Sequence, residues 1–338
     1  MGKKIMLVGN YRWDIYEKAL SDGFMENGVH VISYVVESWS LKDKILNYKK
    51  LRSINEEFVN DVLEQHPDAI FLYRTNDLFP KSIQKIKKNL PMVKIAIFHN
   101  DNPYIGLKNK LKYHFFLSCI KLADLVYVYR PSNLEDVKKM GVQTSKLLYP
   151  HFYSTNNLVD KIDFSIKKYD VVFIGHYEKN RAESIDYLLK RGIRVKIFGS
   201  LSGWKKIKNK YGWTDDVINP PVYGDRYRET LSQAKLALCF LSKINHDVYT
   251  RRNFEIPASG TLCVSEYTDE LTNIFREDEE ILLFKNNYEL HNKVAEVLNE
   301  SEILEIKTAL SYRRVINDKH SEINRAYQII NDLEVLRD

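Results

Sequence analysis

The sequence predicts an α/β protein of two domains, each a parallel β-sheet covered by helices. Short apolar runs that end in glycine or a polar residue alternate with segments of helical periodicity, as is typical of parallel sheets. This alternation lapses between residues 148 and 168, where proline, asparagine and mixed charges interrupt it, and then begins again. The length of 338 residues also exceeds that of one typical core.

The first half of the chain supplies five strand-like runs. They span residues 4–8, 29–36, 69–73, 93–98 and 125–129. Helical periodicity is found at residues 13–25, 80–89 and 133–140, and a lysine-rich amphipathic segment reaches to about residue 65. The polar residues that follow these runs are Gly9 and Asn10, Arg74, His99 and Asp101. Because ligands of parallel sheets bind at the carboxyl ends of strands, we expect these residues to share one edge.

The second half repeats the pattern. Strand-like runs at residues 169–174, 193–198, 236–241 and 281–284 alternate with helical segments at residues 181–190, 226–233 and 288–298. A tail from about residue 302 to residue 336 is expected to form a long helix. We therefore predict a first domain at residues 1–155, a second domain at residues 165–310, and a C-terminal helix at residues 311–338 that packs back toward the first domain.

The segment that indicates function is residues 247–266, with the sequence DVYTRRNFEIPASGTLCVSE. It predicts a helix that begins near Thr250, a stop at residues 259–260 and then a strand. Arg251 and Arg252 in the first turn disfavour the helix itself, but cations at a helix N-terminus suit a diphosphate. Glu255 follows Arg251 by one turn, where a carboxylate can accept hydrogen bonds from a ribose. The alternative is an exposed helix with an i,i+4 ion pair.

Composition is that of an ordinary soluble protein, with 44% hydrophobic and 28% charged residues and a formal net charge of +6. Lysine clusters at residues 42–52, 81–88, 108–112 and 205–210 are typical of solvated helix faces and, less often, of an anionic partner. The cysteines lie far apart in apolar runs, which predicts buried reduced thiols and a cytoplasmic location: Cys119, Cys239 and Cys263. No signal peptide, membrane span or metal-ligand motif is visible, so we expect no metal and only peripheral contact with any membrane.

The motifs of the second half resemble those of retaining glycosyltransferases of the GT-B fold. The resemblance is carried by Asp247, seven residues and then Glu255, followed by the rest of FEIPASG, a strand and Glu266. More narrowly, the sequence is similar to the CgeB-like spore-coat branch, whose signature resembles R-x-F-E-I-x-A-x-G. The segments YDVVFIGHYEKNR and ADLVYVY agree with this branch as well. The resemblance implies two Rossmann-like domains whose parallel sheets face each other across a cleft, with a C-terminal helix that crosses back.

The same resemblance implies roles for individual residues in binding the donor, a nucleotide sugar. Glu255 would hold the ribose hydroxyls, and Asp247 with neighbouring N–H groups would face the sugar. The turn at residues 222–224, which contains Tyr223 and Gly224, would border the base. Gly175 would let the diphosphate approach the backbone, and the candidate cations for that diphosphate are His176, Arg181, Arg251 and Arg252.

The chain departs from the family pattern in two places. Asp247 stands where glutamate is usual, so its carboxylate is one methylene nearer to the backbone. An Arg and Lys pair expected after Gly175 is replaced by His176, Lys179 and Arg181. Both departures concern the contacts to the sugar and to the phosphates.

The predicted mechanism follows from charge. Release of the sugar leaves a nucleoside diphosphate with extra negative charge, which fixed cations can stabilise without a metal or other cofactor. A retaining enzyme of this kind needs no dedicated base, whereas an inverting one would take a base from the first domain, with His99 and Asp101 as candidates. His99 is equally well explained as a strand-end histidine bonded to backbone, and Asp101 somewhat better as a turn residue. The acceptor-side candidates are Gly9, Asn10 and Arg74, of which Arg74 could equally form a surface ion pair.

Three functions are compatible with these observations. The first is a hexosyl- or pentosyltransferase that uses a nucleotide sugar, preferably a UDP-sugar. The second is a nucleotide-sugar epimerase or hydrolase on the same scaffold, and the third is a non-catalytic module that binds nucleotide or sugar. The acceptor is undetermined, because a glycan, a protein, a lipid-linked sugar, a small molecule and modified DNA all fit the basic first domain.

Overall fold

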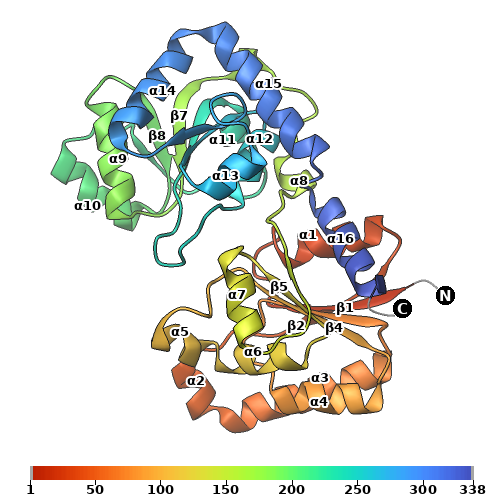
Figure 1. Cartoon of the computed structure of the whole chain (residues 1–338). Helices are drawn as coiled ribbons and strands as arrows, with labels where there is room; N and C mark the ends of the chain where they lie inside the picture. The colour runs from red at the N-terminus through yellow and green to blue at the C-terminus, as the bar shows by residue number, and fades with distance from the viewer. Residues whose placement is uncertain (1–2, 336–338) are drawn as a thin grey trace. The chain divides into compact units, whose positions relative to one another are not determined.

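The computed structural model describes residues 3–335 of the 338-residue chain, which forms two compact units (Figure 1). Unit 1 contains the described residues up to residue 149 and from residue 322 onward, and unit 2 contains residues 150–321. The chain therefore leaves unit 1 once and returns to it. Residues 1–2 of the predicted first domain and residues 336–338 of the predicted C-terminal helix lie outside the described residues.

Unit 1 is built on a six-stranded parallel sheet with the strand order β2-β1-β3-β4-β5-β6. Its strands are β1 (Lys4–Gly9), β2 (His30–Val35), β3 (Ala69–Tyr73), β4 (Lys94–His99), β5 (Leu125–Val128) and β6 (Ser145–Leu147). The central strands are nearly continuous runs of buried apolar residues, as expected for a parallel sheet covered on both faces. The register pairs Tyr73 with Phe98 and His99 with Val128, so the carboxyl ends of β3, β4 and β5 are neighbours.

Helices cover both faces of this sheet. They are α1 (Glu17–Glu26), α2 (Leu41–Leu46), α3 (Tyr48–Gln65), α4 (Pro80–Asn89), α5 (Gly106–Lys112), α6 (His114–Cys119), α7 (Ser132–Lys139) and α16 (Glu322–Val335), with a 3₁₀ turn at Ile120–Leu122. In Figure 1, α3 and α4 lie along one face, and α1 and α16 lie together along the other. Proline at the first position of α4 begins that helix without losing a hydrogen bond, and Ile83 and Ile86 bury its inner face.

The C-terminal helix α16 is an integral part of unit 1. Its start approaches α1 so closely that a Cβ on Gly23 would lie 2.5 Å from the carbonyl oxygen of Glu322. The side-chain amide of Asn27 donates to the carbonyl oxygen of Ile323 at 2.9 Å. Near the other end of α16, the Asp332 carboxylate accepts from the Tyr127 hydroxyl of β5 at 2.7 Å. The helix therefore completes the core of unit 1 beside β5.

Unit 2 repeats the architecture with the strand order β12-β11-β10-β7-β8-β9. Its strands, all parallel, are β7 (Tyr169–Ile174), β8 (Val195–Phe198), β9 (Ile218–Asn219), β10 (Ala234–Cys239), β11 (Leu262–Glu266) and β12 (Leu282–Phe284). Its helices are α8 (Ser154–Asn157), α9 (Lys179–Leu189), α10 (Leu201–Tyr211), α11 (Asp225–Ser232), α12 (Arg252–Ala258), α13 (Asp269–Ile274), α14 (Asn287–Asn299) and α15 (Ser301–Asn317), with a 3₁₀ turn at Phe164–Ile166. The two sheets with their helices confirm the predicted α/β class.

The strands that were predicted agree with the structure to within about two residues at each end, but β6 and β9 were not predicted and two helix predictions are wrong. The helix expected from residue 13 begins at Glu17, because residues 14–16 form a turn. The tail expected as one helix is two helices, α15 and α16, separated at residues 318–321, where Lys319 has a φ of +59°. Helices α5, α6, α10 and α13 were not predicted. Each is either too short to show a clear helical period or is so rich in lysine that few apolar residues show the period. None of the described helices is both long and apolar enough to span a membrane.

Candidate active site

The segment that carries the predicted donor residues forms α12, and two side chains define its start. Asn253 Oδ1 accepts from the N–H of Thr250 at 2.7 Å, and Thr250 Oγ1 accepts from the N–H of Arg252 at 3.2 Å. After Ala258 the chain turns at Gly260, whose φ of +68° is the left-handed conformation that glycine adopts without strain. The predicted start near Thr250 and stop at residues 259–260 are confirmed.

The alternative of an exposed helix with an i,i+4 ion pair is wrong in its exposure, because every residue of α12 after Arg252 is buried. The ion pair itself is present, between Arg251 and Glu255. The expected contribution of the helix N-terminus is also smaller than the sequence indicated. The helix has only seven residues, and the N–H of Arg252 is already bound by Thr250. Any phosphate at this place would be stabilised by the arginine side chains more than by the helix dipole.

Glu255 is 1% exposed and is held from two sides. Arg251 Nε lies 2.7 Å from Oε1, and the Tyr227 hydroxyl donates to Oε2 at 2.9 Å. Burial and the neighbouring Glu255 carboxylate raise the pKa of Tyr227, so its hydroxyl stays protonated and acts as a donor. A carboxylate has about four acceptor positions, so these two contacts fix Glu255 and leave acceptor capacity for a ligand.

Tyr227 is a site residue that the sequence did not reveal. It lies in α11, one turn after Gly224, and 28 positions separate it from Glu255. Tyr223 is 64% exposed, and Gly224 has a φ of +53° at the start of the same helix. The predicted base-binding turn therefore leads directly into the helix that positions Glu255.

Arg181 is a buried cation on α9, with 3% of its surface exposed. Its Nη2 lies 2.6 Å from Glu178 Oε1, and its Nη1 donates to the carbonyl oxygen of His176 at 3.2 Å. Burial lowers the pKa of Arg181, Glu178 opposes this effect and the cation of Arg252 adds to it. Two guanidinium groups, from α9 and α12, therefore act on each other at the carboxyl edge of the sheet. His176 is exposed and lies 2.9 Å from Glu178, so it is positioned at the margin of this group.

Gly175 and Gly199 follow β7 and β8 and lie in contact. A Cβ on Gly175 would lie 2.7 Å from Cζ of Phe173, and a Cβ on Gly199 would lie 2.2 Å from the carbonyl oxygen of Gly175. That oxygen accepts from Trp204 Nε1 at 3.0 Å. Packing against backbone thus requires glycine at position 199, whereas a Cβ at position 175 would meet only the end of a side chain. Both glycines leave bare backbone beside Arg181 and His176.

Asp247 lies half-buried in the loop that follows β10, where its N–H donates to the carbonyl oxygen of Ser242 at 3.0 Å. The loop is attached to the sheet by Glu266, which accepts from the N–H of Leu241 at 2.7 Å and lies 3.0 Å from Lys243 Nζ. His246, just before Asp247, has a φ of +54°. Glu266 therefore has a structural function at the start of this loop.

In unit 1, Arg74, His99 and Asp101 meet at the carboxyl ends of β3 and β4, as predicted. His99 Nδ1 accepts from the N–H of Asp101 at 3.0 Å, and Asp101 Oδ2 accepts from the Tyr113 hydroxyl at 2.7 Å. Burial lowers the pKa of His99 to about 3, with Asp101 opposing and the cations of Arg74, Lys112 and Arg130 adding to the shift. Burial alone would raise the pKa of Asp101, but His99, Tyr113 and the nearby cations hold it below its usual value.

Arg74 does not form the surface ion pair that the sequence left open, since no described acid lies within ion-pair distance of its guanidinium. Its φ is +58°, a conformation that is strained for an arginine. The guanidinium carbon lies 4.2 Å from the ring centre of Tyr16, and its buried Nε and Nη1 have no hydrogen-bond partner among the described residues. A second buried arginine, Arg130, which the sequence did not reveal, donates to the carbonyl oxygen of Asn100 at 3.1 Å.

Gly9 and Asn10 differ from the other acceptor-side candidates because Glu17 already covers them. A Cβ on Gly9 would lie 2.5 Å from Cγ of Glu17, and the N–H of Asn10 donates to Glu17 Oε1 at 3.0 Å. Burial raises the pKa of Glu17, while Arg74 and backbone N–H groups, including that of Tyr11, oppose the shift. The loop after β1 thus holds a carboxylate where a parallel-sheet loop can hold a phosphate.

Metal ligands are not grouped anywhere in residues 3–335, where no three His, Cys, Asp or Glu side chains are placed to hold an ion. The cysteines are all buried and are not part of a disulfide, as expected. Cys239 lies beneath the site, with its Sγ 3.4 Å from Thr250 Oγ1.

Solved structures show that the chain, with its two α/β units, has the GT-B fold. The chain is similar to sucrose-phosphate synthase from Thermosynechococcus elongatus, with a TM-score of 0.72, 12% identity and coverage of 99% of each chain. It is similar to HepE from Anabaena in complex with UDP and glucose, with a TM-score of 0.71, 10% identity and coverage of 98% of this chain and 100% of that one. The S. aureus MnaA complex with UDP gives a TM-score of 0.58 and 11% identity over 98% of this chain and 96% of that one.

A match to a known family is found in the second half of the sequence. Residues 181–331 match the model of a glycosyl transferase-like family, a range that contains Arg181, Tyr227, Asp247 and Glu255. The sequence matches none of the curated proteins significantly.

Proposed function

We propose that the chain is a glycosyltransferase that takes its sugar from a nucleoside diphosphate sugar bound to unit 2. The observation that carries this proposal is the buried Glu255 carboxylate, which Tyr227 and Arg251 hold in place. Arg252, on the same helix, acts electrostatically on the buried cation of Arg181. A fixed acceptor next to several guanidinium groups suits a ribose attached to a diphosphate. The family match over this region supports the assignment.

In this proposal the donor lies along the carboxyl edge of the unit 2 sheet. Glu255 accepts hydrogen bonds from the ribose hydroxyls, and the base lies beside the turn at residues 222–224. The diphosphate lies against the backbone at Gly175 with Arg181 and Arg252 as its cations. UDP is the favoured nucleotide, because HepE, which has the same fold, binds UDP and glucose.

We further propose that transfer proceeds with retention and that the cations alone stabilise the leaving diphosphate. Asp247 and the N–H groups of its loop would face the donor sugar. The candidate bases for the inverting alternative are weak proton acceptors, since the pKa values of His99 and Asp101 both lie below their usual range. This electrostatic setting supports retention, and we therefore propose His99, Asp101 and Arg74 as acceptor contacts.

The two alternative functions that the sequence left open predict different outcomes in an assay. A nucleotide-sugar epimerase or hydrolase would consume donor without acceptor, and a non-catalytic module would bind UDP without turnover. The shorter Asp247 side chain is the feature that favours the module. Membership of the CgeB-like branch, the cytoplasmic location, the class of sugar and the acceptor stay proposals of the sequence alone.

The proposal is tested by nucleotide binding to variants of the Glu255 contacts. UDP at about a hundred times its dissociation constant is expected to stabilise the parent chain by roughly 2.7 kcal/mol, more than ADP or GDP at the same concentration. Glu255→Gln keeps the shape of the side chain but loses its charge, and we expect UDP affinity to fall at least about tenfold. Tyr227→Phe is expected to weaken UDP by a smaller factor, because Glu255 keeps its charge and its contact to Arg251.

Glu229→Gln, an exposed change on α11, is the matched control and should leave UDP affinity unchanged. Equal UDP affinity in Glu255→Gln and the parent would show that the ribose assignment is wrong. Incubation of the parent with UDP-sugars then separates the functions, since release of UDP without any acceptor indicates a hydrolase and a changed sugar an epimerase.

A further inference from the structure

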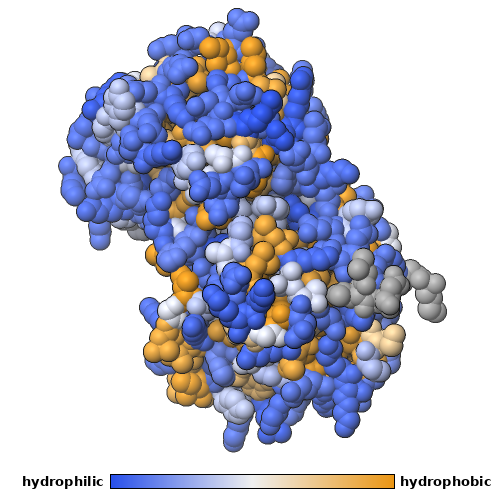
Figure 2. All heavy atoms as spheres, viewed as in Figure 1, coloured by the Kyte–Doolittle hydropathy of each residue, from blue (hydrophilic) through white to orange (hydrophobic). Residues whose placement is uncertain are grey.

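Unit 1 carries an unusual exposed surface on α2 and α5, which we call the α2/α5 surface. Its apolar residues are Leu41, Ile45, Leu46, Leu107 and Leu111, with exposures of 51%, 71%, 68%, 75% and 54%. Leu41 and Ile45 are one turn apart on α2, and Leu107 and Leu111 are one turn apart on α5. Figure 2 shows apolar atoms gathered over the place where Figure 1 labels α2 and α5. A contiguous apolar patch of this kind marks an interaction site.

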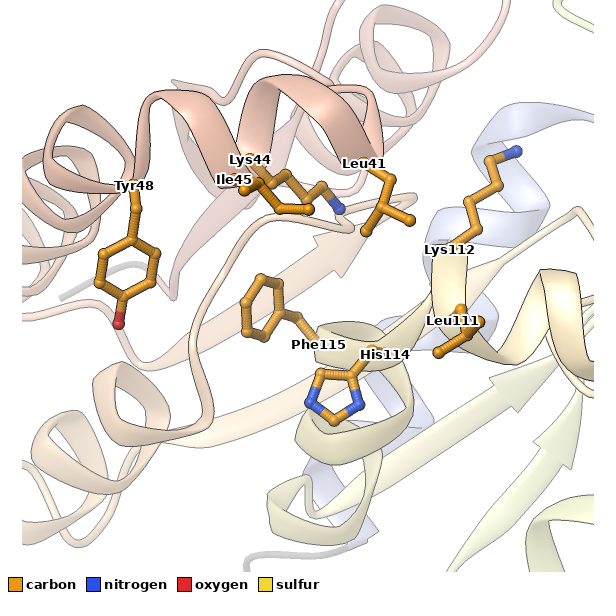
Figure 3. Close-up of a pocket in the computed structure, with 8 residues that line it drawn as sticks. All are labelled: Leu41, Lys44, Ile45, Tyr48, Leu111, Lys112, His114 and Phe115. Carbon is orange, nitrogen blue, oxygen red and sulfur yellow. The ribbon is translucent and has the colours of Figure 1, made fainter.

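Between the two helices lies a groove of about 330 Å³ (Figure 3). Figure 3 shows Leu41 and Ile45 facing Phe115 across it, with Tyr48 at one end and Leu111 at the other. The aromatic side chains of the groove are packed together: Phe115 packs against Phe79 with ring centres 4.9 Å apart, and Phe79 stacks on Tyr48 at 5.7 Å. The groove is thus mostly apolar and partly open to solvent.

The rim of the surface is strongly basic. Its exposed lysines are Lys42, Lys49, Lys50, Lys108, Lys110 and Lys112. None of them forms an ion pair with any acid in residues 3–335, and the segments 41–50 and 106–114 contain one acid, Asp43. Lys44 is different, because it is buried and paired with Asp77 at 2.8 Å. Structural pairing therefore does not account for the other lysines.

We infer that the α2/α5 surface binds a membrane that contains anionic lipids. The leucines and Ile45 would enter the boundary between headgroups and acyl chains, and the lysines would contact the headgroup phosphates. Lysines that form no ion pair with the described acids and surround exposed leucines match such a boundary in both charge and polarity. A nucleic acid would use the lysines but has no partner for the apolar groove, and an acidic protein surface would likewise leave it unfilled.

One contact connects this surface to the acceptor-side residues of unit 1. Lys112 lines the groove, and its Nζ donates to the Tyr113 hydroxyl at 2.8 Å, which in turn donates to Asp101 at 2.7 Å. A membrane on the α2/α5 surface would therefore lie close to the carboxyl edge of the unit 1 sheet. The inference does not depend on the proposed donor site in unit 2, and each can fail without the other.

Vesicle sedimentation tests the inference with the full chain. We expect binding to vesicles of phosphatidylcholine with about one third phosphatidylglycerol and weaker binding to phosphatidylcholine alone. Added salt should weaken the binding to the anionic vesicles, because exposed charges are screened. Leu107→Asp with Leu111→Asp, and separately Lys108→Glu with Lys110→Glu, should each reduce binding at least about tenfold.

Ile306→Asp is the matched control, since Ile306 is 54% exposed on α15 in unit 2. It should bind vesicles like the parent, and all variants should show the parent's thermal unfolding and UDP affinity. Absence of binding to anionic vesicles would overturn the inference. So would binding that survives the leucine variants, because the lysines would then act alone as a general polyanion site.

Discussion

At the scale of single residues, two buried glutamates show how similar sites acquire different functions. Glu17 in unit 1 and Glu255 in unit 2 each lie near the carboxyl ends of parallel strands. Glu17 turns its oxygen toward the N–H of Asn10 and fills the loop after β1. Glu255 is held by side chains from α11 and α12, while Gly175 leaves the loop after β7 without a covering side chain. A carboxylate thus covers the loop after β1 in unit 1, and no carboxylate of the described residues covers Gly175 after β7 in unit 2.

His99 provides a prediction about pH. Its pKa is about 3 in the folded chain and near the ordinary value of 6.5 in the unfolded chain. As pH falls below about 6.5, the unfolded chain takes up a proton at His99 and the folded chain does not, so the folded state loses stability. We expect His99→Gln to lose less stability than the parent between about pH 6.5 and about pH 4.

Urea unfolding of both proteins across that range is the measurement, with His30→Gln as the control. The control should follow the parent, because His30 is exposed at the start of β2. Parallel pH profiles for His99→Gln and the parent would show that His99 ionises normally in the folded state.

At the scale of elements, the two glycines at the ends of β7 and β8 predict a graded effect of adding a methyl group. In Gly199→Ala the new Cβ meets the carbonyl oxygen of Gly175, which cannot move without disturbing β7. In Gly175→Ala it meets the far end of the Phe173 ring, which can shift. We expect Gly199→Ala to cost about 1–3 kcal/mol of unfolding free energy and Gly175→Ala to cost less.

Chemical denaturation of the two variants gives the comparison, and Gly203→Ala, where the nearest atom is Tyr177 Cβ at 3.0 Å, serves as a milder reference. A larger loss of unfolding free energy in Gly175→Ala than in Gly199→Ala would mean that the backbone of β7 shifts more easily than the Phe173 ring. UDP affinity measured on the same proteins tests whether the bare backbone at Gly175 also contributes to binding.

The buried strands and the segment around α12 could be predicted from sequence because local patterns specify them. An apolar run between turn residues predicts β3 and β7. Thr250, Glu255 and Gly260 predict the helix α12, with Thr250 near its start and Gly260 just after its end. Tyr227, Arg130 and Glu17 could not be assigned, because their roles arise only when distant segments fold together. The apolar surface on the short helices α2 and α5 could not be predicted for another reason. Their lysines predict a solvated face, but the sequence does not show that their leucines are exposed, because exposure depends on how the chain folds.

At the scale of the whole molecule, α16 makes unit 1 discontinuous in sequence. Removal of residues 322–338 would uncover the face of α1 where Gly23 lies against Ala326, and would remove the buried Ile329 and Leu333 from unit 1. Each large apolar side chain contributes about 1.5–3 kcal/mol when buried. We expect such a truncated chain to lose protection of the α1 and β5 amides while unit 2 stays folded. Hydrogen exchange measured by mass spectrometry reports both units in one experiment.

A synthetic peptide of residues 322–338 added to the truncated chain should restore protection in α1. Its Asp332→Ala form should do so less well, because Tyr127 and Lys146 both bind that carboxylate. Full protection of α1 in the truncated chain without peptide would show that α16 contributes little to unit 1.

The discontinuity also bears on how the chain is made. Unit 2 begins and ends at one place, where the N–H of Phe152 donates to the carbonyl oxygen of His320 at 3.0 Å. During synthesis every part of unit 2 has therefore emerged while unit 1 still lacks its last helix. Domains usually fold in the order in which they are translated. In this protein the later-made unit is expected to finish first, and unit 1 stays incomplete, with its α1 face uncovered, until α16 has been synthesised.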